Sequence, residues 1–498
     1  MNKFTAIITS FAVQIIITSC TGYGIIYDDK HLEVSTDEQQ CLDQPNTDCL
    51  LNSARAISTS MSDAVAQSEA LNVLAKTQYQ LGRHATALEL IAAMPILALK
   101  FNSLFELTQI TKTHNNSTAP LLKFADSLID NSQAARDKIP ALLLRAVLAY
   151  KNQNLKTAQH YLAQARAYME NTRLKQHKAL NLPFFSKILP TLMELKAFNT
   201  INSIIVFQTT PAKQMLAQLK FLVLLHKKQP KQAKLQLGEI LIRWPKLSDK
   251  SQRLRVLAAV IQTLVRFDRL DEANQILDEQ DSFIVRTTLR SIIIQQLANM
   301  GQIAQAKHAL TRQLRDIRHY SIPKQTEQKS QALRDNFELN KLRAQAIADV
   351  ALALANGTKM IQAVYLAEQI QPLMGHIQGY SLTKIALMYA QQGDINSALL
   401  TMESIHRGVN RAACLAQISA VVAKAGDIPR AKIIAARVDR QSWRDIALSE
   451  ISISLAQKNT ITAAMTVLNE IQRSYSSVYA MAKIALVLQT RTNQQTEK

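Results

Sequence analysis

The feature that most constrains the fold is a unit of 33 residues that recurs along the C-terminal part of the chain. The segments AQQGDINSALL (390–400), AKAGDIPRAKI (423–433) and AQKNTITAAMT (456–466) each begin 33 residues after the one before. The same step relates four isoleucines: Ile385, Ile418, Ile451 and Ile484. Self-similarity at a fixed period of this length is the signature of stacked supersecondary units. The sequence therefore predicts one repeated structural unit rather than several different domains.

Each unit has the pattern of two amphipathic helices joined by a Gly-Asp turn. Apolar residues recur at i, i+3, i+4 and i+7 on both sides of the turn. We expect Gly393 and Gly426 to end the first helix in a left-handed conformation, and the aspartate after each to cap the second helix. A small residue, Ala398 or Ala431, follows five positions after the glycine. The Gly-Asp pair is thus predicted to be an inter-helix turn, and not part of a phosphate or metal site.

The same frame continues towards the N-terminus, although different residues occupy the turn position. The predicted upstream turn residues are Gly82, Gln153, Lys228, Asp268, Gly301 and Gly357. Weaker copies around 114–120 and 198–204 bring the total to about eleven helix pairs, followed by a last helix over about 477–490. The chain has only 11 Gly and 12 Pro in 498 residues, too few for the many turns of a β-protein or of an enzyme with several shaped loops. The predicted fold class is all-α.

The unit resembles the tetratricopeptide repeat (TPR) over roughly residues 60–490. In the copy at 379–411 the matching positions are Leu382, Ala386, Tyr389, Gly393 and Ala398. The resemblance implies an α-solenoid of about eleven TPR-like helix pairs that winds into a right-handed superhelix and binds protein partners without catalysis. The chain departs from the family in its period, which is often 33 and not 34, in its lack of the family's tryptophan, and in the missing closing proline of most copies.

The chain begins with MNKFTAIITSFAVQIIITSC, in which one lysine precedes a short apolar stretch. This stretch fits the apolar part of a secretory signal and is too short for a membrane span. The residues Ile-Thr-Ser before Cys20 resemble the bacterial lipobox. That resemblance implies a lipoprotein signal peptide over 1–19, lipid attachment to Cys20, and an outer-membrane protein facing the periplasm of a Gram-negative bacterium. An ordinary cleaved signal, an uncleaved anchor and a cytosolic apolar start are the alternatives.

Residues 20–50 are predicted to be an acidic tether that leads to the folded body over 51–498. Seven acids stand against Lys30 in 21–50, a charge of −6, so the body from residue 51 onward carries +25 while the whole chain has a net charge of +20. Cys41 and Cys49 flank a Pro-Asn segment and could pair in an oxidising periplasm, or remain as two exposed thiols. Cys414 lies among apolar residues and is interpreted as a small core residue.

Two segments of the body are candidates for binding. Within 213–255 only two acids accompany eleven basic residues. The candidate contacts for an anionic partner are Lys227, Lys228, Lys231, Lys234, Arg243, Lys246, Lys250, Arg253 and Arg255. They could hold an acidic polymer or lipid headgroups, or could form a solvated basic face. Nucleic acid is not expected as a partner, because the predicted signal peptide directs the chain out of the cytosol.

The second candidate segment is an insertion at about 314–341, where the step between predicted turns lengthens from 33 to 56 residues. Insertions in helical repeats project from one face and often serve binding. The alternative is a lengthened helix pair with a polar loop.

Known catalytic and phosphate-binding motifs, CxxC pairs and clusters of histidines are missing from the sequence, so no catalytic residue, metal site or cofactor is predicted. The leading hypothesis is a non-catalytic periplasmic scaffold, anchored to the outer membrane by lipid, that binds protein partners in cell-envelope assembly. The alternative is a soluble helical-repeat protein that binds an acidic polymer or anionic lipid through its basic face. An enzyme with a site composed from several repeats is the third hypothesis.

Overall fold

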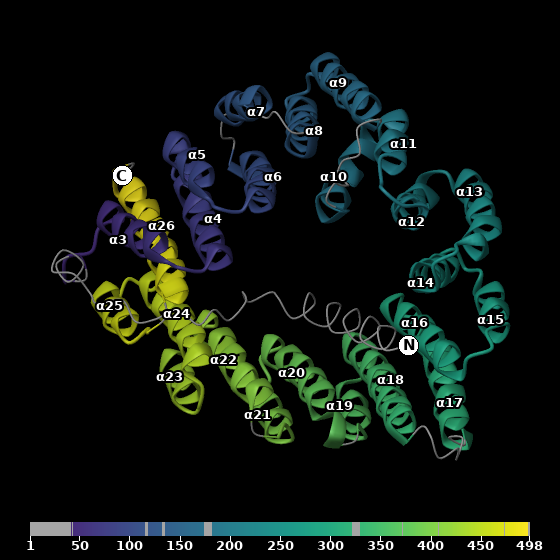
Figure 1. Cartoon of the computed structure of the whole chain (residues 1–498). Helices are drawn as coiled ribbons and strands as arrows, with labels where there is room; N and C mark the ends of the chain where they lie inside the picture. The colour runs from purple at the N-terminus through teal and green to yellow at the C-terminus, as the bar shows by residue number, and fades with distance from the viewer. Residues whose placement is uncertain are drawn as a thin grey trace. The chain divides into compact units, whose positions relative to one another are not determined.

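The computed structural model describes residue 41 and residues 43–114, 118–131, 135–173, 182–320, 329–370, 372–406, 408–472 and 474–496 (Figure 1). Across these residues the protein is all-α, 85% helical and without strands, as the composition predicted. Cys20, the predicted signal peptide and most of the predicted tether lie outside the described residues.

The chain divides into two compact units. Unit 1 contains residues 1–256 and 455–498, and unit 2 contains residues 257–454. The helices of unit 1 are α3 (Thr47–Ser60), α4 (Ala64–Gln80), α5 (His84–Ala93), α6 (Leu97–His114), α7 (Ala119–Asn131), α8 (Ala135–Lys151), α9 (Leu155–Arg173), α10 (Leu182–Glu194), α11 (Phe198–Val206), α12 (Pro211–Lys228), α13 (Pro230–Arg243), the short η1 (Trp244–Lys246), α25 (Ile461–Asn469) and α26 (Ser474–Thr496).

The helices of unit 2 are α15 (Leu270–Asp278), α16 (Phe283–Asn299), α17 (Ile303–His319), α18 (Lys329–Asn356), α19 (Met360–Glu368), the short η3 (Pro372–Met374), α20 (Gly375–Gln391), α21 (Ile395–Glu403), α22 (Val409–Lys424) and α23 (Ile428–Ala436). The helices α14 (Lys250–Arg266) and α24 (Gln441–Gln457) each have residues in both units.

Helices that follow one another pack as pairs, and each pair packs on the next, in a repeat-like array. In unit 2 the first helix α20 contacts its own second helix α21 and also α22, the first helix of the following pair. The first helices α16 and α20 have 17 residues, and the second helices α19, α21 and α23 have 9. One pair alone cannot bury the apolar faces of both helices, so consecutive pairs must stack.

The turns within the pairs share one backbone geometry. Among the described residues, nine of these turns contain a residue with φ between 54° and 94°: Gly82, Gln153, Lys196, Asp268, Gly301, Thr358, Gly393, Gly426 and Asn459. The amide of Gly393 donates to the carbonyl of Ala390, and the next amide donates to the carbonyl five residues back, both at 3.0 Å. This is the Schellman arrangement that ends helices in a left-handed residue.

The structure confirms that the Gly-Asp pairs are inter-helix turns. The side chains of Asp394 and Asp427 accept hydrogen bonds from the backbone N–H of Ser397 at 3.0 Å and of Arg430 at 3.2 Å. Each aspartate therefore caps the second helix of its pair.

Two predicted turn residues are wrong. The left-handed residue of its turn is Thr358 and not Gly357, which places Ala363 five residues after the turn, as in the other pairs. Lys228 is the last residue of α12, and the non-helical Gln229, with φ of −139° and ψ of 70°, connects it directly to α13. Pro230 explains this difference, because proline disfavours helical backbone in the residue before it and is well suited to start a helix.

The residue five positions after each left-handed turn is fully buried. Its exposed fraction is 0% at Ala87, Ala158, Ile201, Ala273, Ala306, Ala363, Ala398, Ala431 and Ala464. Eight of these nine are alanines, because a small side chain suits the close approach of the second helix to the first, and the ninth is Ile201. Small residues also recur at a step of 33 in the first helices, and these residues, Ala386, Ser419 and Ser452, are likewise 0% exposed.

The insertion predicted at 314–341 falls on two lengthened helices. The second helix α17 has 17 residues where its counterparts have 9, and the first helix α18 has 28 where α16 and α20 have 17. Residues 321–328 between them lie outside the described residues. Most of the inserted residues that the structure describes therefore extend a helix pair.

The folded body of unit 1 begins earlier than the predicted boundary at residue 51. Helix α3 starts at Thr47, and Cys41 is only 3% exposed. Helix α3 packs on both α26 and α4 (Figure 1), and Thr47 Oγ1 donates to the carbonyl of Ala485 in α26 at 3.5 Å. Helix α26 is thus a first helix whose second helix, α3, comes from the other end of the chain.

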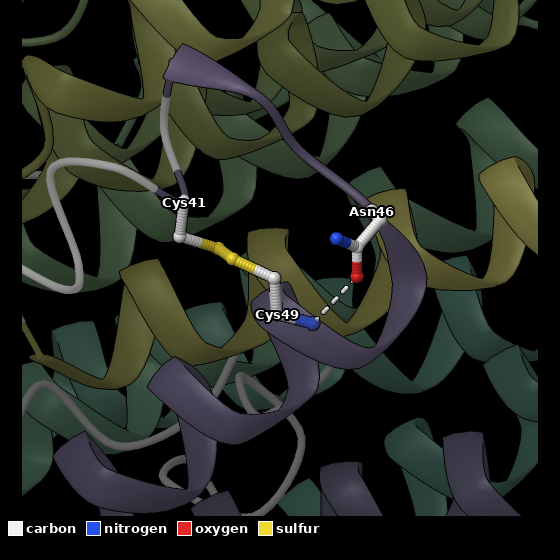
Figure 2. The surroundings of a disulfide bond; sticks show 3 residues. All are labelled: Cys41, Asn46 and Cys49. Atoms are coloured by element: carbon white, nitrogen blue, oxygen red, sulfur yellow. Dashed lines mark hydrogen bonds between the residues drawn. A yellow bond between two sulfur atoms is a disulfide. The ribbon is translucent and has the colours of Figure 1, made fainter.

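A disulfide and a cap hold the start of α3. The structure joins Cys41 to Cys49, whose Cα atoms are 5.7 Å apart (Figure 2). In the same loop the side chain of Asn46 accepts a hydrogen bond from the N–H of Cys49 at 2.9 Å and caps the helix. Residues that composition assigned to a tether therefore belong to the packed array.

Candidate interaction surfaces

The nine basic residues predicted to bind an anionic partner all lie in unit 1, from the end of α12 to the start of α14. The side chains at 227, 228, 231, 234, 243, 246, 250 and 255 are exposed, whereas Arg253 is half-buried and donates to the carbonyl of Pro245 at 3.4 Å. Within the described part of the chain, none of the lysines from 227 to 234 forms an ion pair. Their charges therefore remain available to solvent or to a ligand.

Helix α13 presents a mixed basic and aliphatic face outward. Its buried side chains, Ala233, Leu237 and Ile240, lie on one side of the helix. At 100° per residue the opposite side carries Lys231, Leu235, Gly238 and Ile242, which we call the α13 ridge. Leu235 is 72% exposed and Ile242 is 66% exposed. Charge counting along the sequence found the lysines but missed these two aliphatic residues, because their spacing of seven also suits a buried helix face.

The two acids of the basic segment have different surroundings. The carboxylate of Asp249 accepts hydrogen bonds from the N–H groups of Gln252 and Ser251 and caps α14, and these bonds hold the pKa of Asp249 below its usual value. Glu239 is exposed on the outward half of α13 beside the ridge. One acid is therefore committed to a helix end, and the other reduces the positive charge of the ridge.

A second surface feature lies on unit 2, across α19, α21 and α23. Large apolar side chains are exposed there: Ile361 at 82%, Tyr365 at 68%, Leu400 at 74% and Ile433 at 67%. Tyr365, Leu400 and Ile433 stand at the same repeat position, seven residues after the left-handed turn residue of their pair. We call these four residues the apolar stripe.

Polar side-chain contacts hold the helices of the stripe together, and most of them join residues about one repeat apart in the sequence. Ser404 donates to the Glu368 carboxylate at 2.7 Å, and Arg430 donates to the Asn396 side chain at 2.7 Å. Glu403 accepts from both Arg411 and Arg437, and the bond from Arg411 is the main reason that the pKa of Glu403 is lowered. These contacts connect α19 to the end of α21, and α21 to α22 and α23, so the exposed apolar side chains sit on a fixed support.

A polar cleft of about 580 Å³ lies among α7, α8 and α9 in unit 1. One of its lining carboxylates, Asp126, accepts hydrogen bonds from Arg145 Nε at 2.7 Å and from the Tyr161 hydroxyl at 3.1 Å. The Arg145 guanidinium also lies over the Tyr161 ring, 4.8 Å from its centroid. Asp126, Arg145 and Tyr161 thus bind one another and form a structural network among α7, α8 and α9.

The other titratable groups of the described residues form no metal site. Among the described residues no three His, Cys, Asp or Glu side chains lie close enough to hold a metal ion, and no helix is long and apolar enough to cross a membrane. Cys414 is a buried free thiol whose pKa is raised to about 12 by burial, so it is a core residue. Burial also raises the pKa of Asp349 to about 7, and the Oδ1 atom of Asp349 accepts from Gln345 at 3.3 Å.

Comparison with known proteins adds little. Neither a protein-family model nor a characterised protein of similar sequence matches the chain. Among solved structures the chain is similar to Ton1535 from Thermococcus onnurineus NA1, with 12% identity over 82% of this chain and 96% of that one, at a TM-score of 0.26. A score that low does not indicate a shared fold.

Proposed function

We propose that the chain is a non-catalytic scaffold that binds a protein partner in cell-envelope assembly. In this proposal the array is a TPR-like α-solenoid, and a lipid on Cys20 anchors it to the outer membrane on the periplasmic side. The repeat pattern, the recurring left-handed turns and the fully buried small residues support a TPR-like array. The lipobox-like residues before Cys20 support the anchor.

The observation that carries the binding role is the apolar stripe. In the other described pairs with a left-handed turn, the position equivalent to Tyr365, Leu400 and Ile433 is polar: Glu89, His160, Ser203, Gln275, His308 and Thr466. The array therefore does not require an apolar residue there. A row of exposed apolar side chains on a fixed support is typical of a protein-binding surface.

The spacing of the stripe favours an amphipathic helix as the bound element. Side-chain hydrogen bonds bridge α19 to the end of α21 and α21 to α23, so the stripe is a row of apolar side chains at equivalent repeat positions. A partner helix laid across this row would contact Tyr365, Leu400 and Ile433 with one amphipathic face, on which apolar residues recur every seven positions, about 10.5 Å apart. This is the helix-in-groove mode of recognition, in which one amphipathic face supplies the anchors.

The anchor and the stripe are tested separately. Replacing Cys20 with Ser removes the acylated thiol, so metabolic labelling with a fatty acid should be lost and the protein should leave the membrane fraction. Unchanged labelling or unchanged membrane retention would contradict the anchor.

For the stripe, a triple variant carrying Tyr365→Ser, Leu400→Ser and Ile433→Ser should lose its partner in chemical crosslinking of intact envelopes. Because these side chains are exposed, their replacement should change the free energy of unfolding by less than about 1 kcal/mol. The matched control replaces Gln275 with Ser at the equivalent position of α15. An unchanged crosslinking pattern in the triple variant would reject the stripe as the binding surface.

A further inference from the structure

We propose that the α13 ridge, together with the lysines beside it, docks on the surface of an anionic lipid bilayer. This surface lies on unit 1 and shares no residue with the apolar stripe of unit 2, and it does not include Cys20. The inference can therefore hold or fail independently of the proposed scaffold function.

The first argument is the combination of chemistries on one outward face. Leu235 and Ile242 are 72% and 66% exposed, and they lie one helical heptad apart on the side of α13 opposite its buried residues. Lys231 stands on the same line, with Lys234 and Arg243 on its flanks. A helix that presents aliphatic side chains among lysines and arginines matches the interfacial zone of a membrane, where acyl chains and phosphates meet.

The second line of support is that the positive charge is concentrated and is offset beside the ridge only by Glu239. Lys227 and Lys228 at the end of α12 add to the charge of α13, and none of the four lysines from 227 to 234 is ion-paired within the described chain. Asp249 is held at the N-terminus of α14 by the N–H groups of Ser251 and Gln252. Each lysine near an anionic bilayer strengthens binding by about fivefold.

The aliphatic residues favour a bilayer over an acidic polymer. A polyanion would contact the cations and leave Leu235 and Ile242 in water, whereas a bilayer accepts both kinds of group at once. Replacing Leu235 and Ile242 should therefore weaken binding to a bilayer and leave binding to an acidic polymer unchanged.

The experiment uses the full chain carrying Cys20→Ser, so that no lipid anchor contributes. Binding is measured by co-sedimentation with vesicles of phosphatidylcholine containing about one-third phosphatidylglycerol, and with vesicles of phosphatidylcholine alone. We expect binding to the anionic vesicles only, and weaker binding as salt is raised, since salt screens the lysines.

Two variants of the ridge and one matched control show which residues contribute to vesicle binding. Leu235→Ser with Ile242→Ser should weaken vesicle binding by about tenfold or more, because two aliphatic side chains no longer enter the interface. Glu239→Gln should strengthen it by several-fold, since one repulsive charge is removed. The matched control is Leu400→Ser with Ile433→Ser, two aliphatic residues of almost the same exposure on unit 2, which should bind vesicles like the parent.

Several results would overturn the inference. Equal binding to neutral and anionic vesicles would remove the role of the lysines. Parental vesicle binding by the Leu235→Ser and Ile242→Ser variant would remove the role of the ridge. If the vesicles are not bound but soluble polyglutamate is, equally by parent and variant, the surface belongs to an acidic polymer instead.

Discussion

Two glycine-to-alanine substitutions in unit 1 test whether the turn glycines serve only the backbone. Gly82 has φ of +78° at the turn between α4 and α5, whereas Gly238 lies inside α13. Apart from the chain neighbours and, for Gly238, the backbone of its own helix, a Cβ atom at either position would meet no atom within 4 Å. The two substitutions therefore add the same methyl group to open space, and they differ in the backbone conformation that receives it.

The expected effects have opposite signs. A left-handed conformation costs a residue with a side chain about 1–2 kcal/mol, so Gly82→Ala should lower the free energy of unfolding by that amount. Gly238→Ala should raise it by about 0.5–1 kcal/mol, because alanine restricts the unfolded chain and favours the helix. For a cooperative unit of roughly 300 residues, 1 kcal/mol corresponds to a shift in Tm of about 1.5 °C.

Circular dichroism of the helix signal, followed in urea and on heating, measures both variants against the parent. We expect Tm to fall by about 1.5–3 °C for Gly82→Ala and to rise by about 1 °C for Gly238→Ala. If Gly82→Ala is as stable as the parent or more stable, the turn does not depend on the left-handed backbone, and the proposed role of the glycine is refuted.

Ala398→Leu should lower the free energy of unfolding by about 1–3 kcal/mol in urea titration, because the side chain at 398 is fully buried where α21 approaches α20; a loss below 0.5 kcal/mol would contradict that close approach. Removing both cysteines with Cys41→Ser and Cys49→Ser should lower stability by about 2–3 kcal/mol, and reductant should then have no further effect on Tm. An unchanged Tm would show that the disulfide does not secure α3. Asp349 has a pKa of about 7 in the folded protein against about 4 in the unfolded chain. Between these two pH values the folded state keeps a proton on Asp349 that the unfolded state has lost. The free energy of unfolding should therefore fall as pH rises from about 4 to 7. Asp349→Asn should flatten this dependence in unfolding measured at pH 5 and pH 8, and an unchanged slope would contradict it.

The repeat could be predicted from sequence because its geometry depends on local residues. A left-handed turn favours Gly or Asn, which occupy five of the nine turns, and a close helix approach favours a small side chain, so both recur at fixed positions in the chain. The errors also arose locally. At Gly357 the glycine suggested the turn, but the structure uses Thr358, and the buried Ala363 was the better guide. At Lys228 the following Pro230 changed the connection.

The packing of α3 on α26 could not be predicted in the same way, because it joins the two ends of the chain outside the period. Leu50, Leu51, Ala54 and Ile57 do form a helical apolar face, but the acids before them suggested a tether.

The surfaces were predicted only in part. Basic residues could be counted directly, whereas the exposure of Leu235, Ile242 and the apolar stripe depends on which side of each second helix faces the array.

The most direct test of the scaffold claim is site-specific photocrosslinking in the native envelope. A photoreactive amino acid is placed at Leu400, in the centre of the apolar stripe, and in a separate strain at Gln275, the equivalent exposed position of α15. We predict one discrete protein adduct from position 400 that disappears when Tyr365→Ser and Ile433→Ser are added, and none from position 275. Identical adducts from both positions, or no protein adduct from position 400, would contradict a scaffold that binds its partner through this stripe.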